Sequence, residues 1–152
     1  MKMLVLFVLG TMLLYTRSVS QSQQMATIVF VCEHGGARSA IASVYFNKMA
    51  KEQNLQYRSI FRGITPDSTI SQATRRGLDA DGFETAALSP VALTSNDIGP
   101  STLLISLDCK PPTSYHTTKE WSGIPAISTD YAVARDEIVK HLNQLIGELK
   151  TK

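Results

Sequence analysis

Residues 27–39 have the sequence TIVFVCEHGGARS, and this stretch carries the strongest structural signal in the chain. Its first part, Thr27–Val31, is a continuous apolar run rich in β-branched residues, which is typical of a buried strand in a parallel sheet. A pair of glycines at positions 35 and 36 then interrupts the strand as a turn. Apolar residues recur at helical spacing after the turn, so we expect a helix over residues 39–51. The stretch therefore predicts a strand, a tight loop and a helix.

The rest of the chain repeats this alternation of strands and helices. We expect further strands at residues 57–61, 102–107 and 123–127, and further helices at residues 70–78 and 130–149, the last with Asp130 as its N-cap. Such a pattern implies right-handed βαβ units and a parallel sheet covered on both faces. Ligands in these sheets bind at the carboxyl ends of the strands, where the loop after residue 31 would lie.

The loop from Cys32 to Arg38 has the composition of an oxyanion-binding loop. A loop of this length can curl so that its backbone N–H groups and the start of the following helix point at one anion. The two glycines permit the positive φ values of such a curl, and Arg38 can hold two oxygens at once. We expect the anion to be bound by the loop positions Glu33, His34, Gly35, Gly36, Ala37 and Ser39.

The same donors would stabilise a thiolate on Cys32, which makes this residue the candidate nucleophile and Arg38 its catalytic partner. Ser39 is placed to donate a hydrogen bond to that thiolate. The alternative is that Cys32 is a buried residue at a strand end and Arg38 an ordinary surface residue. His116 and His141 are isolated in the sequence, so we expect them at the surface, and we expect neither a metal site nor a cofactor.

Residues 28–39 resemble the active-site loop of the low-molecular-weight protein tyrosine phosphatases and the related thioredoxin-coupled arsenate reductases. Gly63, the segment from Leu93 to Ile98, and the region from Trp121 to Ile138 extend the resemblance over nearly the whole chain after residue 24. The resemblance implies a flavodoxin-like, three-layer α/β/α fold with a four-stranded parallel sheet. It also implies a hydrolase of phosphate monoesters such as phosphotyrosine, with Cys32 as nucleophile and Arg38 as oxyanion clamp.

This sequence departs from the family pattern at one catalytic position. The phosphatases carry an Asp-Pro pair whose aspartate protonates the leaving group, whereas Pro125 follows Ile124 here. Asp108 and Asp130 are the nearest substitutes, although a strand-end role for the first and an N-cap role for the second are the simpler expectations. Trp121 and Tyr131 either line the mouth of the site or pack beneath it. A non-catalytic, anion-binding protein is therefore a further alternative.

Cys109 follows the expected strand 102–107 and supports another alternative. In a flavodoxin-like sheet this strand lies beside the first one, so Cys109 can approach Cys32. An arsenate reductase would use both thiols on arsenate and would need a thiol reductant. The related reductases use three cysteines, whereas this chain has two, and Cys109 is otherwise a half-buried loop residue.

The first 20 residues have the composition of a secretory signal peptide. Lys2 precedes an apolar run to Tyr15 that is too short for a stable membrane span, and small residues precede a cleavage point after Ser20. We therefore expect an exported protein, periplasmic or secreted, whose domain covers residues 25–152; a start at Met25 would instead make it cytoplasmic. Cleavage would remove two basic residues and no acidic one, so the formal charge of +2 would fall to 0. A neutral mature chain argues against nucleic acid as a partner.

Overall fold

The computed structural model describes residues 25–151, which form an α/β domain around one parallel sheet. Its strands and helices, in chain order, are β1 (Ala26–Cys32), α1 (Arg38–Glu52), β2 (Tyr57–Gly63), α2 (Gln72–Ala80), the 3-10 helix η1 (Ser95–Asp97), β3 (Thr102–Leu107), β4 (Lys119–Trp121) and α3 (Tyr131–Leu149). The first three expected strands and all three expected helices are confirmed, with ends that differ by a few residues.

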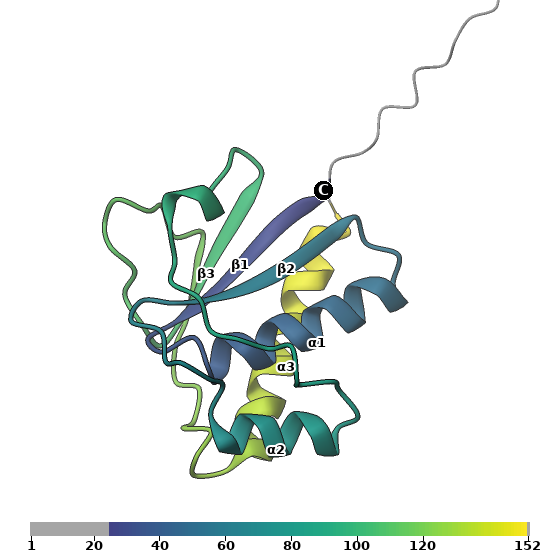
Figure 1. The fold of residues 1–152 in the computed structure, drawn as a ribbon. Coiled ribbons are helices and arrows are strands. Elements are labelled where there is room, and N and C mark those ends of the chain that lie inside the picture. Colours follow the sequence, from purple (N-terminus) through teal and green to yellow (C-terminus); the bar gives the residue numbers. More distant parts are fainter. Residues whose placement is uncertain (1–24, 152) are drawn as a thin grey trace, which may run out of the picture.

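The sheet has the strand order β2-β1-β3-β4, and all neighbouring strands run parallel. Figure 1 shows the first three, with β1 between β2 and β3. The chain passes from β1 to β2 on one side and then returns to place β3 on the other side of β1. The strand order therefore reverses at β1, which is where ligands bind in sheets of this kind. Cys32 ends this strand, paired with Gly63 of β2.

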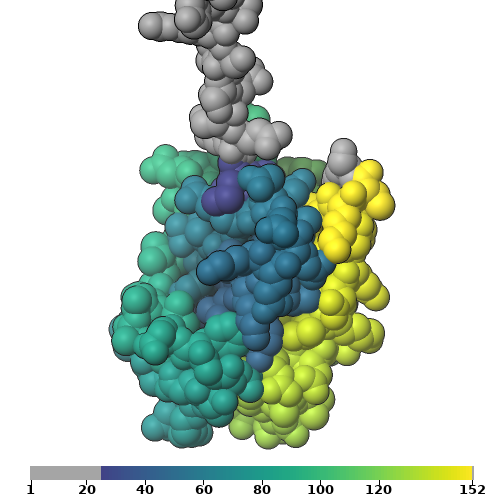
Figure 2. Space-filling model, turned by 90° about the vertical axis from the view of Figure 1, so that its right-hand side faces the viewer, coloured from purple at the N-terminus to yellow at the C-terminus, as the bar shows by residue number. Residues whose placement is uncertain are grey.

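The two faces of the sheet are covered differently. The larger core lies between the sheet and the three helices, with Phe30, Phe46 and Ile138 fully buried in it. Figure 2 looks onto this helical side, where α3, in yellow and yellow-green, lies beside α1, in blue. A smaller cluster centred on Val29, Val31 and Leu104 occupies the other face. The flavodoxin-like α/β class with a four-stranded parallel sheet is confirmed. Loops and η1 form the outer layer on this second face.

The fourth strand is not where the sequence pattern placed it. Residues 123–127 form no strand, and β4 at Lys119–Trp121 pairs with β3 instead. The reason is a competing acceptor: the Asp108 carboxylate takes the backbone N–H groups of Gly123 and Ile124, at 2.8 and 2.9 Å. Pro125 has no N–H to offer. Ile124 and Ile127 of this run therefore pack into the core without joining the sheet.

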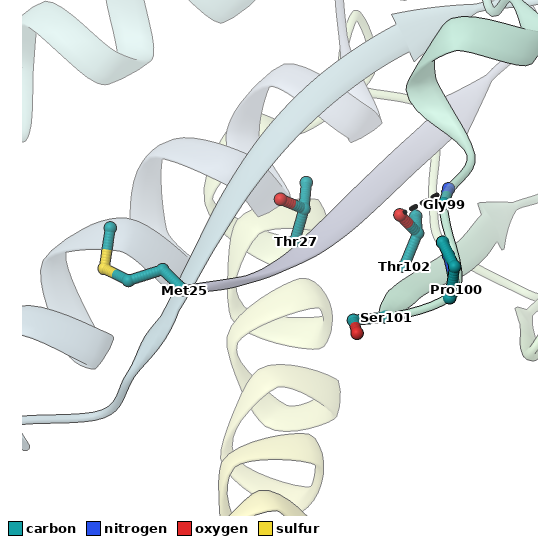
Figure 3. Close-up of a pocket in the computed structure, with 6 residues that line it drawn as sticks. All are labelled: Met25, Thr27, Gly99, Pro100, Ser101 and Thr102. Atoms are coloured by element: carbon teal, nitrogen blue, oxygen red, sulfur yellow. Dashed lines mark hydrogen bonds between the residues drawn. The ribbon is translucent and has the colours of Figure 1, made fainter. Parts of the chain in front are cut away.

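A hollow of about 240 Å³ lies at the amino-terminal ends of β1 and β3 (Figure 3). Its lining consists of Met25, Thr27, Gly99, Pro100, Ser101 and Thr102, none of which titrates near neutral pH. This end of the sheet is opposite to Cys32, so the hollow is separate from the candidate site.

The predicted signal peptide and its cleavage point lie outside the described residues, and export stays a prediction. Within residues 25–151, no helix combines the length and the apolar composition needed to cross a bilayer.

Candidate active site

The loop between β1 and α1 is held by its carbonyl groups. Four of its backbone carbonyls accept hydrogen bonds from one neighbouring segment, residues 64–71. These bonds join the N–H groups of Ile64, Thr65, Asp67 and Ser71 to the carbonyls of Cys32, Glu33, His34 and Gly36, at 3.1, 2.8, 3.1 and 2.8 Å respectively. The segment therefore fixes the loop's main chain along one side.

The backbone N–H groups of the loop, unlike its carbonyls, are not engaged by residues 64–71. Within residues 25–151, no protein acceptor takes a hydrogen bond from the backbone N–H groups of residues 33–38. The N-terminus of α1, which begins at Arg38, adds its own partial positive charge at the same place. A row of free donors at a helix start is suited to an anion with several oxygens.

Two glycines make this arrangement sterically possible. Gly35 has a φ of +67°, and a Cβ there would lie 2.9 Å from the backbone nitrogen of Gly63. A Cβ on Gly36 would lie 2.9 Å from the carbonyl oxygen of Thr69. The close approach of the two segments therefore requires glycine at both loop positions for reasons of space. The positive φ that the sequence predicted for both glycines occurs at Gly35 and not at Gly36.

Cys32 is almost fully buried, with 3% of its surface exposed, and its thiol lies 3.1 Å from the hydroxyl of Ser39. The same hydroxyl lies 3.3 Å from the carbonyl oxygen of Gly35 and 3.2 Å from that of Arg62. A hydroxyl has one proton, so it can donate to only one of these at a time. When Cys32 is a thiolate, the strongest acceptor of the three is the sulfur.

Arg38 reaches from the start of α1 to the segment after β4. Its Nε and Nη2 donate to the carbonyl oxygen of Ile124 at 3.2 and 3.0 Å. Its Nε also lies 3.5 Å from the carboxylate of Asp108, which follows β3. The predicted oxyanion clamp is thus already ordered by contacts within the protein.

Neither candidate for a substitute general acid is free. Both carboxylate oxygens of Asp108 accept backbone N–H groups, as described above for the segment after β4. Asp130 is the N-cap of α3 and accepts from the N–H of Val133 at 3.1 Å. The simpler structural expectations for these two residues are confirmed.

Glu33 and His34 are exposed and follow Cys32 in the loop. The Thr65 hydroxyl lies 3.4 Å from a Glu33 carboxylate oxygen. The His34 Nδ1 lies 3.3 Å from the Thr65 carbonyl and 3.7 Å from the Asp67 carboxylate. Both side chains are therefore directed toward the segment that holds the loop. Ala37 packs against the main core.

Cys109 lies close to β1, but on the other face of the sheet from Cys32. Its thiol donates to the carbonyl of Val31 at 3.4 Å, and its side chain packs against the smaller cluster, whereas Cys32 belongs to the larger core. Burial raises the pKa of the Cys109 thiol to about 11, and the nearby Glu33 and Asp108 charges add to the rise. Both cysteines are free thiols in this structure.

Trp121 and Tyr131 serve packing. Trp121 is buried against Phe30 and stacks on His141, with ring centroids 4.9 Å apart. Tyr131 donates its hydroxyl proton to Asp81. His116 is exposed, as expected, but His141 is half-buried because of its stacking on Trp121. Among the described residues, no group of three or more His, Cys, Asp or Glu side chains has a geometry suited to a metal ion.

Sequence reasoning missed the segment 64–71, which holds the loop through main-chain donors that carry no side-chain signature. It also missed the link from Asp108 through Ile124 to Arg38. The sequence did contain one signal for the segment 64–71: Gly63 directly precedes it, and a Cβ on Gly63 would lie 2.9 Å from the backbone of the loop.

No protein-family model matches this sequence, and no curated protein matches it. Solved structures do match. A thioredoxin-dependent arsenate reductase of Corynebacterium glutamicum is 20% identical, with a TM-score of 0.67 over 86% of this chain and 64% of that chain. This chain thus spans less than two thirds of that enzyme. A low-molecular-weight protein tyrosine phosphatase from T. tengcongensis is 15% identical, with a TM-score of 0.67 over 81% of this chain and 99% of that one.

An arsenate reductase in a phosphate-binding state is also similar, at 14% identity and a TM-score of 0.66, over 82% of this chain and 99% of that chain. The fold that the sequence resemblance implied is therefore confirmed. Phosphatases and arsenate reductases are matched equally well, so the fold does not distinguish between their two reactions.

Proposed function

We propose that this chain is a cysteine-dependent hydrolase of phosphate monoesters, with Cys32 as nucleophile and residues 33–38 as the anion-binding loop. The observation that carries the proposal is the row of free N–H groups beside the buried Cys32 thiol. A loop that directs four of its carbonyls toward a second segment is suited to binding negative charge on its other side. The hydroxyl of Ser39 supports a thiolate at the same point.

The chemistry follows from this arrangement. The loop N–H groups and Arg38 bind the phosphate oxygens, and the Cys32 thiolate attacks phosphorus. The S–P bond forms as the ester P–O bond breaks, and the leaving oxygen departs with the bonding electron pair. Water then attacks phosphorus, the S–P bond breaks, and the thiolate is regenerated with inorganic phosphate as product. The same donors stabilise the charge on the equatorial oxygens in both steps.

The absence of an aspartate at position 124 restricts the preferred substrate. Ile124 occupies the place where an aspartate would protonate the leaving group, and Asp108 accepts two backbone hydrogen bonds. Loss of a general acid typically costs roughly 10²–10⁴-fold in rate. Aryl phosphates suit this site better than alkyl phosphates, because a phenolate leaves without a proton more easily than an alkoxide.

Arsenate reduction is the second candidate, favoured by the contact of the Cys109 thiol with the end of β1. In that reaction the Cys32 thiolate would form a bond to arsenic while one As–O bond breaks and its oxygen leaves as water. The sulfur of Cys109 would then attack that of Cys32. The S–As electron pair would pass to arsenic, reducing it from As(V) to As(III) and leaving a disulfide for an external thiol to reduce. The raised pKa of Cys109 and its place on the opposite face mean that residues near it must first move.

One set of variants separates these candidates from an anion-binding protein without turnover. The purified protein and its Cys32→Ser and Cys109→Ser variants are assayed for p-nitrophenyl phosphate hydrolysis and for thiol-dependent arsenate reduction. Phosphatase turnover that is lost with Cys32→Ser and kept with Cys109→Ser supports the main proposal. Arsenate turnover that needs both thiols supports the second candidate. Phosphate binding without either turnover supports a binding protein, and a Cys32→Ser variant with unchanged binding and activity contradicts the role of the loop.

A further inference from the structure

Asp108 has an unusual backbone conformation at the end of β3. Its φ is +47°, in the left-handed region that non-glycine residues seldom adopt. Aspartate tolerates this region better than most residues, because its short side chain can make local hydrogen bonds. The turn at Asp108 takes the chain away from the sheet directly after Leu107, and its carboxylate reaches across to the segment that follows β4.

That carboxylate holds the segment with two main-chain hydrogen bonds. One oxygen accepts the N–H of Gly123 at 2.8 Å and the other accepts the N–H of Ile124 at 2.9 Å. Gly123 has a φ of +77°, which turns two successive N–H groups toward the same carboxylate. The position of the Ile124 peptide is therefore set by Asp108.

The carbonyl of the same Ile124 residue orients Arg38. It accepts from Nε and Nη2 at 3.2 and 3.0 Å, and the second oxygen of Asp108 lies 3.5 Å from Nε. One edge of the guanidinium is therefore occupied. Among residues 25–151, no acceptor takes a hydrogen bond from Nη1. The edge formed by Nη1 and Nη2 stays available, and such a fork matches two oxygens of a tetrahedral anion.

We propose that Asp108 is a positioning residue: through the main chain of Ile124 and its own contact with Nε, it fixes Arg38 so that the Nη1–Nη2 edge faces the oxyanion. This inference rests on the proposed function, since it assigns a role within the same site. The inference also assigns Ile124 a role through its main chain, since an isoleucine side chain cannot act as an acid. The arginine is thus held in place before the reaction, with its free edge aligned for the oxygens of the transition state.

The test compares Asp108→Asn with Asp130→Asn. Each variant changes into an amide a carboxylate that accepts backbone hydrogen bonds. The Asp108 carboxylate holds the segment that orients Arg38, whereas the Asp130 carboxylate caps α3. For Asp108→Asn we expect kcat for p-nitrophenyl phosphate to fall roughly 10- to 100-fold, as for a misplaced catalytic group. The KM and the Kd for inorganic phosphate should change much less, because the loop N–H groups remain. Asp130→Asn should keep the wild-type kcat. A kcat for Asp108→Asn within twofold of the wild type overturns the proposal.

A second measurement needs neither turnover nor a stable variant. In wild-type protein labelled with ¹⁵N, the Arg38 Nε–H should exchange with solvent much more slowly than that of the exposed Arg76. Equal exchange rates would contradict the positioning role, whether or not Asp108→Asn folds. A wild-type protein that neither binds phosphate nor hydrolyses the aryl ester would contradict the proposed function. The exchange rate of the Arg38 Nε–H would still test whether this side chain is held in place.

Discussion

Cys32 and Ser39 meet although seven positions separate them in the sequence, because the loop between them closes on itself. The Ser39 side chain is fully buried and lies within hydrogen-bond distance of the Cys32 sulfur and of two backbone carbonyls. This single hydroxyl therefore links the candidate nucleophile to the loop and to β2. At the scale of one residue, the site depends on a buried polar group with several acceptors.

Replacement of Ser39 by alanine should slow the alkylation of Cys32 by iodoacetamide at fixed pH, since the thiolate loses its nearest donor. We also expect a loss of about 1–3 kcal/mol in the free energy of unfolding, because buried carbonyls lose a partner. Ser43→Ala is the matched control: Ser43 is likewise buried on α1 and bonded to Ser59, at 3.0 Å. It should cost similar stability without changing Cys32 alkylation. Equal alkylation rates in the two variants would contradict the role of Ser39.

Replacement of Gly35 by alanine should disrupt the loop more than its backbone conformation alone requires. The new Cβ would lie 2.9 Å from the Gly63 nitrogen, in addition to the cost of a positive φ. Gly82→Ala isolates the second effect, because Gly82 has a φ of +85° and open space around it. We expect about 1–2 kcal/mol of destabilisation for Gly82→Ala, and a larger loss, together with loss of phosphate binding, for Gly35→Ala. Denaturant unfolding and phosphate titration check this, and equal stabilities would refute the steric argument.

At the scale of elements, the carboxyl ends of β1 and β3 carry the two thiols on opposite faces of the sheet. Successive side chains of a strand alternate between faces, so Cys32 points to the helical side, whereas Val31 contacts the loops. Cys109 packs on the same face of the sheet as Val31, which is the face covered by loops. Adjacent strands thus bring the two cysteines near each other in the backbone while the pleat separates their side chains.

Cys109 should be a slow nucleophile at neutral pH. Burial raises its pKa from the ordinary value of 9.0 to about 11, so the thiol should react with iodoacetamide more slowly than an exposed model thiol at pH 8. In the unfolded chain the Cys109 thiol loses its proton at a lower pH than in the folded protein. The free energy of unfolding should therefore fall as the pH rises from about 9 to about 11. The Cys109→Ser variant should lack that component. Peptide mapping of alkylated protein gives the rates, and modification of Cys109 at the model-thiol rate would contradict the burial.

At the scale of the whole molecule, Asp81 joins all three helices at the end of α2. Its carboxylate accepts from Tyr45 of α1 at 2.6 Å, from Tyr131 of α3 at 2.7 Å, and from Arg135 of α3 at 3.1 Å. Partial burial alone would raise the pKa of Asp81, but these hydrogen bonds and the Arg135 charge outweigh it and lower the pKa. One ionised carboxylate therefore links the three helices, in addition to the apolar core beneath them.

The Asp81→Asn variant should be less stable than the wild type by about 2 kcal/mol at neutral pH, since hydrogen bonds to a charged acceptor are lost. A lowered pKa in the folded state means that this contribution is complete above pH 3.8 and disappears as the pH falls through the folded-state pKa. The two proteins should therefore converge in stability in acid. Asp136→Asn removes an exposed partner of the same arginine and should have little effect. A stability difference that persists unchanged in acid would contradict the ionised network.

Local sequence determined those features that depend on neighbouring residues. The buried strand at β1, the glycine turn, the helix after it and the N-cap at Asp130 were all predictable, because apolar periodicity and capping act within a few positions. Cys32, Arg38 and Ser39 were identifiable as candidate site residues for the same reason, since a short loop brings them together.

Only the tertiary structure decided which groups face the site and which are engaged elsewhere. The 123–127 run was predicted to be a strand, but Asp108 takes its N–H groups, a competition between residues 15 and 16 positions apart. The segment 64–71 acts through main-chain donors, which leave no pattern in the sequence. The separation of Cys32 from Cys109 follows from the pleat and the strand order, which depend on long-range packing. The stretch TIVFVCEHGGARS thus sets the loop and its candidate nucleophile, whereas the surrounding fold sets the orientation of Arg38 and the burial of the second thiol.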